Sequence, residues 1–106
     1  MWSQPEEGSV SVAVTLQFQV KPDKVSDVLN FLRKNVPDHR SYEGCESLAV
    51  HQSQDDPTRF FLYEQWTARP RHEAYLAWRS ETGMLAELVE MLAGEPSFGY
   101  YNTVDG

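Results

Sequence analysis

The sequence predicts a two-layer α+β domain with the β-α-β-β-α-β order of the ferredoxin-like, split βαβ arrangement, in which the sheet is antiparallel. Three observations lead to this prediction. Residues 10–20 alternate between apolar and polar side chains, two later regions have the spacing of amphipathic helices, and three further segments are rich in strand-forming residues. A chain of 106 residues has room for one such domain. We therefore expect a flexible tail over residues 1–9 and a single domain over residues 10–106.

The first strand and the first helix follow from the spacing of their apolar residues. On the strand, every second position is apolar: Val12, Val14, Leu16, Phe18 and Val20. One face of this strand is therefore expected to be buried. Pro22 and Asp23 open a helix whose apolar residues recur every three or four positions. We expect Pro37 to end this helix, because proline lacks a backbone N–H and clashes with the preceding turn.

The remaining segments complete the order of elements. Residues 45–52 and 59–66 are predicted to be strands joined by a polar loop, and residues 97–102 a final strand. A second helix is predicted from about residue 70 to residue 80, with Gly83 separating it from an amphipathic stretch over residues 84–92. These helices cover one face of the sheet and leave the other uncovered, with Phe61 and Tyr63 on it. We expect two copies to pair these faces as a homodimeric α+β barrel.

Composition excludes several classes of partner. The chain has nine basic and 16 acidic residues, for a net charge of −7, which argues against nucleic acid and against anionic membranes. A single cysteine, Cys45, cannot form an internal disulfide and fits a reducing cytoplasm, where we expect the protein. The three histidines have no spacing typical of metal ligands, so we expect no metal site.

One stretch carries a resemblance to a known family. Residues 60–66, Phe-Phe-Leu-Tyr-Glu-Gln-Trp, end a strand in Tyr-Glu-x-Trp and are followed after a short break by an amphipathic helix. This pattern resembles the antibiotic biosynthesis monooxygenase family, over about residues 12–101, and residues 75–83 look like its quinol monooxygenase branch. The resemblance implies a dimeric α+β barrel that oxidises phenols, quinols or anthrone-like polyketides with O₂. Many members do so without a metal or an organic cofactor.

The family also includes haem-degrading enzymes, and the resemblance can be tested for that branch. The haem branch has an asparagine in the first strand, the tryptophan of the third strand, and a histidine nine residues after that tryptophan. This sequence has Trp66 but carries Thr15 and Tyr75 at the other two positions. We therefore expect no haem.

The candidate site residues lie mainly on the second helix. His72, Tyr75 and Arg79 share one helical face. One interpretation places this face in a pocket, where His72 or Tyr75 moves a proton and Arg79 stabilises a phenolate. The other interpretation exposes this face and packs residues 74–78 inward. We expect further substrate contacts from Trp66, Trp78, Phe18 and His51, and a structural role for Glu64, paired with backbone or an arginine.

The sequence therefore predicts a small oxygenase that acts on an electron-rich aromatic substrate with O₂. Two alternatives from other classes stay open: a ligand-binding or regulatory dimer without turnover, and a polyketide cyclase-like enzyme of the same fold. The sequence also leaves open the use of reduced flavin supplied by a partner reductase. It does not identify the substrate.

Overall fold

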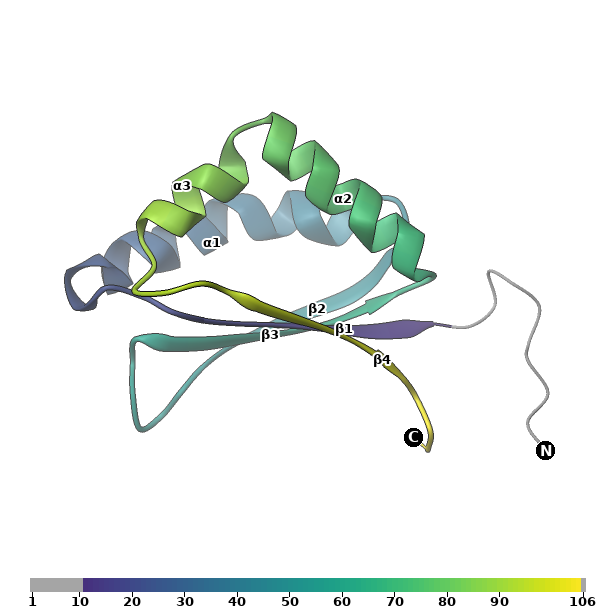
Figure 1. Cartoon of the computed structure of the whole chain (residues 1–106), viewed down its shortest axis with the longest axis horizontal. Helices are drawn as coiled ribbons and strands as arrows, with labels where there is room; N and C mark the ends of the chain where they lie inside the picture. Colours follow the sequence, from purple (N-terminus) through teal and green to yellow (C-terminus); the bar gives the residue numbers. More distant parts are fainter. Residues whose placement is uncertain (1–10, 106) are drawn as a thin grey trace.

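The computed structural model describes residues 11–105 and shows the predicted two-layer α+β architecture (Figure 1). The sheet is antiparallel in the order β2-β3-β1-β4, and its helices lie on one face. The elements are β1 (Val12–Gln19), the 3₁₀ turn η1 (Pro22–Lys24), α1 (Val25–Ser41), β2 (Cys45–Gln52), β3 (Arg59–Trp66), α2 (Arg69–Glu81), α3 (Met84–Glu90) and β4 (Ser97–Asn102). The predicted order of strands and helices is confirmed, whereas the predicted tail over residues 1–9 lies outside the described residues.

The sheet is built around β1, which pairs with β3 on one side and β4 on the other. Its alternation fixes which side chains face the helices, and these form two buried clusters. The first is hydrocarbon, with members that include Leu16, Phe18, Val28, Leu32, Phe60, Leu62, Leu88 and Leu92. The second lies at the other end of the strands and contains Val14, Trp66 and Tyr75. The register explains this division, because Phe18 pairs with Phe60 whereas Val12 pairs with Trp66.

The predicted end of the first helix at Pro37 is wrong, since α1 continues through Pro37 to Ser41. Pro37 is exposed, and its missing N–H leaves only the carbonyl of Arg33 without its helical partner. Against this single loss, the continued helix carries the buried stripe of Val28 and Leu32 on to His39. Burial along that stripe outweighs one lost hydrogen bond. The extra turn is what brings His39 under α2.

Two glycines with positive φ set the position of α2. Gly83, at φ 84°, separates α2 from α3, as the sequence predicts. Gly44, at φ 98°, lies in the turn before β2, and a Cβ there would come within 2.6 Å of the Cβ of Arg71 on α2. Glycine therefore allows the first turn of α2 to approach this turn closely. Within residues 11–105, the helices are too short or too polar to cross a lipid bilayer.

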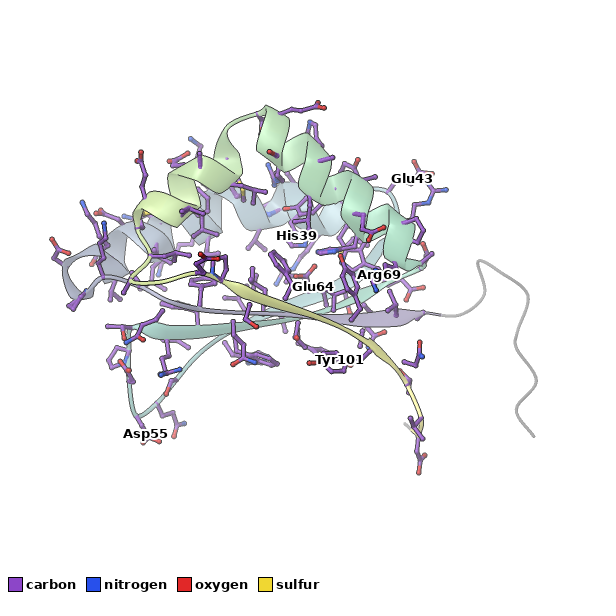
Figure 2. All side chains as sticks on the ribbon, viewed as in Figure 1. His39, Glu43, Asp55, Glu64, Arg69 and Tyr101 are labelled. Carbon is purple, nitrogen blue, oxygen red and sulfur yellow. The ribbon has the colours of Figure 1, made fainter. Side chains whose placement is uncertain are left out.

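The sheet face opposite the helices carries exposed aromatic side chains. Phe61, Tyr63 and Tyr101 are 37%, 39% and 55% exposed. Figure 2 shows Tyr101 on this side of the sheet and Arg69 on the helix side. The predicted uncovered face is therefore present.

Candidate functional site

Polar and aromatic side chains lie together between α2 and the sheet. They come from α1, β3, α2 and β4, and we call them the Glu64 cluster: His39, Glu64, Trp66, His72 and Tyr100. Trp66, Glu64 and His72 are at most 1% exposed. Figure 2 shows His39 and Glu64 in the layer between the helices and the sheet.

Glu64 is the centre of this cluster. Its Oε1 atom lies 2.8 Å from His39 Nε2 and accepts a hydrogen bond of 2.8 Å from Trp66 Nε1. Burial disfavours the charged carboxyl group, but the hydrogen bond and charge of His39, together with Trp66, outweigh burial and hold the pKa of Glu64 below its ordinary value. Glu64 is therefore an ionised carboxylate at neutral pH.

His72 lies beside this carboxylate and is held as a neutral ring. Burial lowers its pKa, although the charge of Glu64 partly opposes that effect. The Nε2 atom is 3.8 Å from Glu64 Oε1, and the Nδ1 atom is 2.7 Å from the Tyr100 hydroxyl. Because a carboxylate favours a proton on the nearer nitrogen, we assign the ring hydrogen to Nε2 and the lone pair to Nδ1. Nδ1 then accepts a hydrogen bond from the phenol of Tyr100.

Tyr75 and Arg79 form a buried pair next to this cluster. Arg79 Nε donates to the Tyr75 hydroxyl at 2.9 Å, and another Arg79 nitrogen donates to the Asn35 carbonyl at 3.0 Å. Burial raises the pKa of Tyr75 to about 12, so Tyr75 is a poor acid at neutral pH. The Arg79 guanidinium also lies 4.5 Å from the centre of the Trp78 ring. These contacts tie α2 to α1 through Asn35.

The comparisons with known proteins agree with this fold. The sequence model of the antibiotic biosynthesis monooxygenase family matches residues 11–86. The chain belongs to this family. Among curated proteins, none matches the chain.

Solved structures with the family's fold superpose on most of the chain. A structure described as an antibiotic biosynthesis monooxygenase has a TM-score of 0.81 at 21% identity, covering 89% of this chain and 99% of that chain. A conserved protein from Methanosarcina mazei Go1 has a TM-score of 0.80 at 22% identity, covering 91% and 95%. Rv0793 from Mycobacterium tuberculosis has a TM-score of 0.80 at 22% identity, covering 91% and 97%. At these identities the likeness concerns the fold.

The structure brings most of the candidate residues of this family member together. His72, Tyr75 and Arg79 are all buried, so the interpretation in which their face of α2 is exposed is wrong. Trp66 packs against Tyr75, with ring centres 5.5 Å apart, and half-buried Trp78 lies 6.1 Å from Tyr75. The predicted catalytic stripe and the two tryptophans therefore form one region.

Two candidate substrate contacts lie elsewhere. Phe18 stacks on Phe60 at 5.5 Å within the hydrocarbon cluster, because it lies six positions along β1 from the partner of Trp66. His51 is exposed on the uncovered sheet face and stacks on Phe61 at 5.9 Å. Neither side chain is part of the Glu64 cluster.

Three members of the cluster were not predicted as functional. Glu64 pairs with His39 and Trp66, whereas the sequence favoured backbone or an arginine as its partner. The signal for His39 is its position, seven residues after Leu32 on the same helical stripe. The signal for Tyr100 is strand alternation, which places it opposite Val14 on the helix side.

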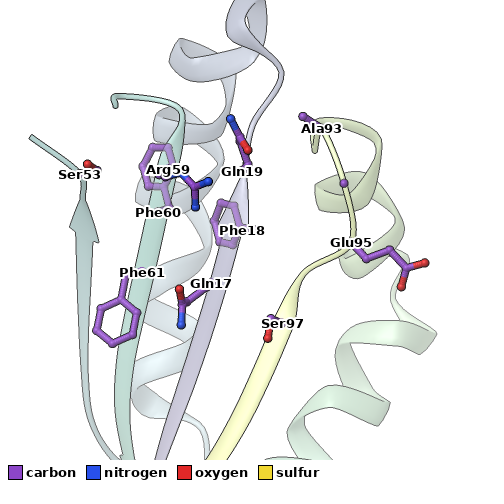
Figure 3. A pocket seen from close by; sticks show the side chains of 11 residues that line it. Gln17, Phe18, Gln19, Ser53, Arg59, Phe60, Phe61, Ala93, Glu95 and Ser97 are labelled. Carbon is purple, nitrogen blue, oxygen red and sulfur yellow. The ribbon is translucent and has the colours of Figure 1, made fainter. Parts of the chain in front are cut away.

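A separate cavity of about 530 Å³ lies at the opposite end of the strands (Figure 3). Gln17, Phe18, Arg59, Phe61 and Glu95 are among its lining residues, and no member of the Glu64 cluster is. Among the described residues, no three His, Cys, Asp or Glu side chains are arranged to hold a metal ion.

The lowered pKa of His72 predicts how stability depends on pH. The unfolded chain binds a proton at this ring below about pH 6.5, whereas the folded chain resists it, so the free energy of unfolding falls as pH drops through that range. Urea unfolding at pH 7.5 and pH 5.5 should show this loss in the natural chain, and His72→Gln should reduce it. His51→Gln, which removes an exposed histidine, should retain the loss. An equal loss in all three proteins would show that His72 does not titrate as described.

Proposed function

We propose that this chain is a small oxygenase that acts on an electron-rich aromatic substrate, a quinol, phenol or anthrone-type polyketide, without a metal or haem. Family membership supports oxygenase chemistry, and one observation in the site supports the substrate class. His72 Nδ1 lies 2.7 Å from a phenolic hydroxyl, that of Tyr100. A neutral imidazole in this position can take the proton of a phenol.

Removal of the phenolic proton is the step that needs the protein. The resulting phenolate transfers one electron to O₂, and the phenoxyl radical and superoxide combine at a ring carbon that carries hydrogen. The peroxide formed there takes the proton held by His72 and becomes a hydroperoxide. Loss of water, with the hydrogen of that carbon, leaves a carbonyl, so one phenol and one O₂ give one quinone and one H₂O.

The neighbours of His72 favour this proton transfer. When Nδ1 takes a proton, the ring becomes an imidazolium whose Nε2 faces the Glu64 carboxylate at 3.8 Å. The charge on Glu64 stabilises that imidazolium, while His39 and Trp66 keep Glu64 in place. The Trp66 ring stands edge-on to His72, with centres 5.2 Å apart, and supplies an aromatic wall for the substrate.

We also propose that the protein is a homodimer that joins through the uncovered sheet face. Large aromatic side chains exposed on one face of a sheet favour a partner. Phe61 and Tyr63 are on β3, and Tyr101 is on β4. A second copy of the same face would cover them with matching aromatic surface.

The oxygenase proposal predicts O₂ uptake with quinols or anthrones in the absence of added metal or flavin. His72→Gln should lower turnover by about 10²-fold or more, because it removes the proton acceptor. Glu81→Gln changes an exposed residue at the far end of the same helix and should retain turnover. An oxygen electrode with a panel of such substrates measures both. No uptake with any of them, or full activity of His72→Gln, would contradict the proposal.

The dimer proposal predicts a mass of about 24 kDa in solution, twice the 12.2 kDa of the chain. Phe61→Glu places a charge on the proposed interface and should yield a folded monomer. Val89→Glu, on α3 in the helix layer, changes a side chain that is 51% exposed and should leave the dimer intact. Light scattering at micromolar concentration decides the question, and a natural chain of about 12 kDa contradicts the proposal.

A further inference from the structure

The Glu64 cluster is closed to a substrate as it stands. His72 and Glu64 are each 1% exposed and Trp66 is 0% exposed, so no molecule can reach His72 Nδ1 without displacing a side chain. The atom that occupies the acceptor direction of Nδ1 is the hydroxyl oxygen of Tyr100. Access to the proposed base therefore depends on Tyr100.

Tyr100 is placed where a side chain can leave the cluster. It lies on β4, which is the edge of the sheet and pairs with β1 alone. Its side chain is half-buried, and the exposed Arg69 covers its ring, with the guanidinium carbon 4.0 Å from the ring centre. Phe98, two residues earlier on the same face of β4, is 41% exposed and lies 5.8 Å from the His72 ring. This edge is thus the partly open side of an otherwise buried cluster.

We propose that the Tyr100 side chain occupies the substrate's place, and that a phenolic substrate binds by displacing it and donating its own hydroxyl to His72 Nδ1. This inference rests on the proposed function and adds to it a binding position and a narrower substrate class. Tyr100 donates its hydroxyl hydrogen, because Nδ1 of His72 carries only a lone pair in the assigned tautomer. A phenol or quinol reproduces that donor, whereas a carboxylate or an ether does not.

The shape of the Tyr100 side chain and its contacts indicate what kind of ligand fits in its place. The tyrosine side chain is a phenol with one alkyl substituent opposite the hydroxyl, so the vacated space fits a single ring substituted at that position. Its ring is covered by the Arg69 guanidinium, which favours an electron-rich π face. Phe98 and Trp66 remain as aromatic walls near His72. We infer that the substrate is a monocyclic phenol or quinol whose substituent points away from His72.

The experiment uses Tyr100→Ala and p-cresol, which is the tyrosine side chain as a free molecule. Calorimetry should show saturable binding of p-cresol to the folded variant, at least tenfold tighter than to the natural chain, where Tyr100 competes. The ¹⁵N signal of His72 Nδ1 should shift on binding. 4-Methylanisole carries a methyl group in place of the hydroxyl hydrogen and should bind about three- to tenfold more weakly, since it leaves Nδ1 unpaired. Tyr101→Ala, which empties a position on the opposite face of β4, should gain no p-cresol site.

A second variant decides the question if Tyr100→Ala does not fold. Tyr100→Phe keeps the ring but loses the hydrogen bond to His72, so the closed state is weaker and p-cresol should bind about three- to tenfold more tightly than to the natural chain. The inference is wrong if folded Tyr100→Ala does not bind p-cresol, if the anisole binds equally well, or if Tyr100→Phe shows unchanged or weaker affinity. Because these are binding measurements without turnover, p-cresol binding in a protein that consumes no O₂ would contradict the oxygenase proposal alone.

Discussion

The buried carboxylate of Glu64 is the constraint on which the rest of this site depends. An ionised carboxylate taken out of water costs several kcal/mol unless close partners replace its hydration. Here the partners come from three elements: His39 from the last turn of α1, Trp66 from the end of β3, and His72 from the first turn of α2. Each of these elements must therefore be in place before Glu64 can be buried. The pairing links the ends of α1 and α2 to the sheet at one end of the strands.

The two ends of the molecule consequently serve different purposes. At one end, Phe18, Phe60 and Leu88 pack as hydrocarbon and contribute stability by burial. At the other end, the same layer holds a carboxylate, two histidines and a tyrosine hydroxyl as two hydrogen-bonded pairs, His39 with Glu64 and His72 with Tyr100, which approach to 3.8 Å between Glu64 and His72. Family membership accounts for the fold, but a fold supports many activities. The residues around His72 are what favour proton transfer from a phenol.

Much of the fold could be predicted from sequence because its signals are local. The alternation on β1 and the apolar spacing on α1 identify these elements, and the spacing of His72, Tyr75 and Arg79 correctly places them on one helical face. Spacing alone left open whether that face is buried. The local rule for Pro37 failed because packing of the stripe through His39 outweighs one lost hydrogen bond. No local sequence signal shows which of these two effects, burial of the stripe or the lost hydrogen bond, is larger.

The alternation of side chains along a strand also predicts which face of the sheet a residue lies on, but not which end of the sheet it is near. Phe18 faces the helices as predicted, but its partner Phe60 is six residues from Trp66, or about 20 Å at the rise of a strand. His51 lies on the non-helical face, as its alternation indicates, whereas the polar cluster formed on the other. Strand register and the pairing of distant elements decide at which end and on which face of the sheet the polar cluster forms. They depend on contacts between residues far apart in the chain, such as His39 with Glu64.

The state of the His72 ring tests the central claim most directly. If Glu64 holds the ring hydrogen on Nε2 and burial keeps the ring neutral, then ¹⁵N spectra of histidine-labelled protein at pH 7 should show a protonated Nε2 and an unprotonated Nδ1 for His72. Assignment follows from the signal lost in His72→Gln. A ring protonated on Nδ1, or on both nitrogens, would donate to the Tyr100 hydroxyl and could not accept a proton from a phenol there. That result would contradict the account of this site.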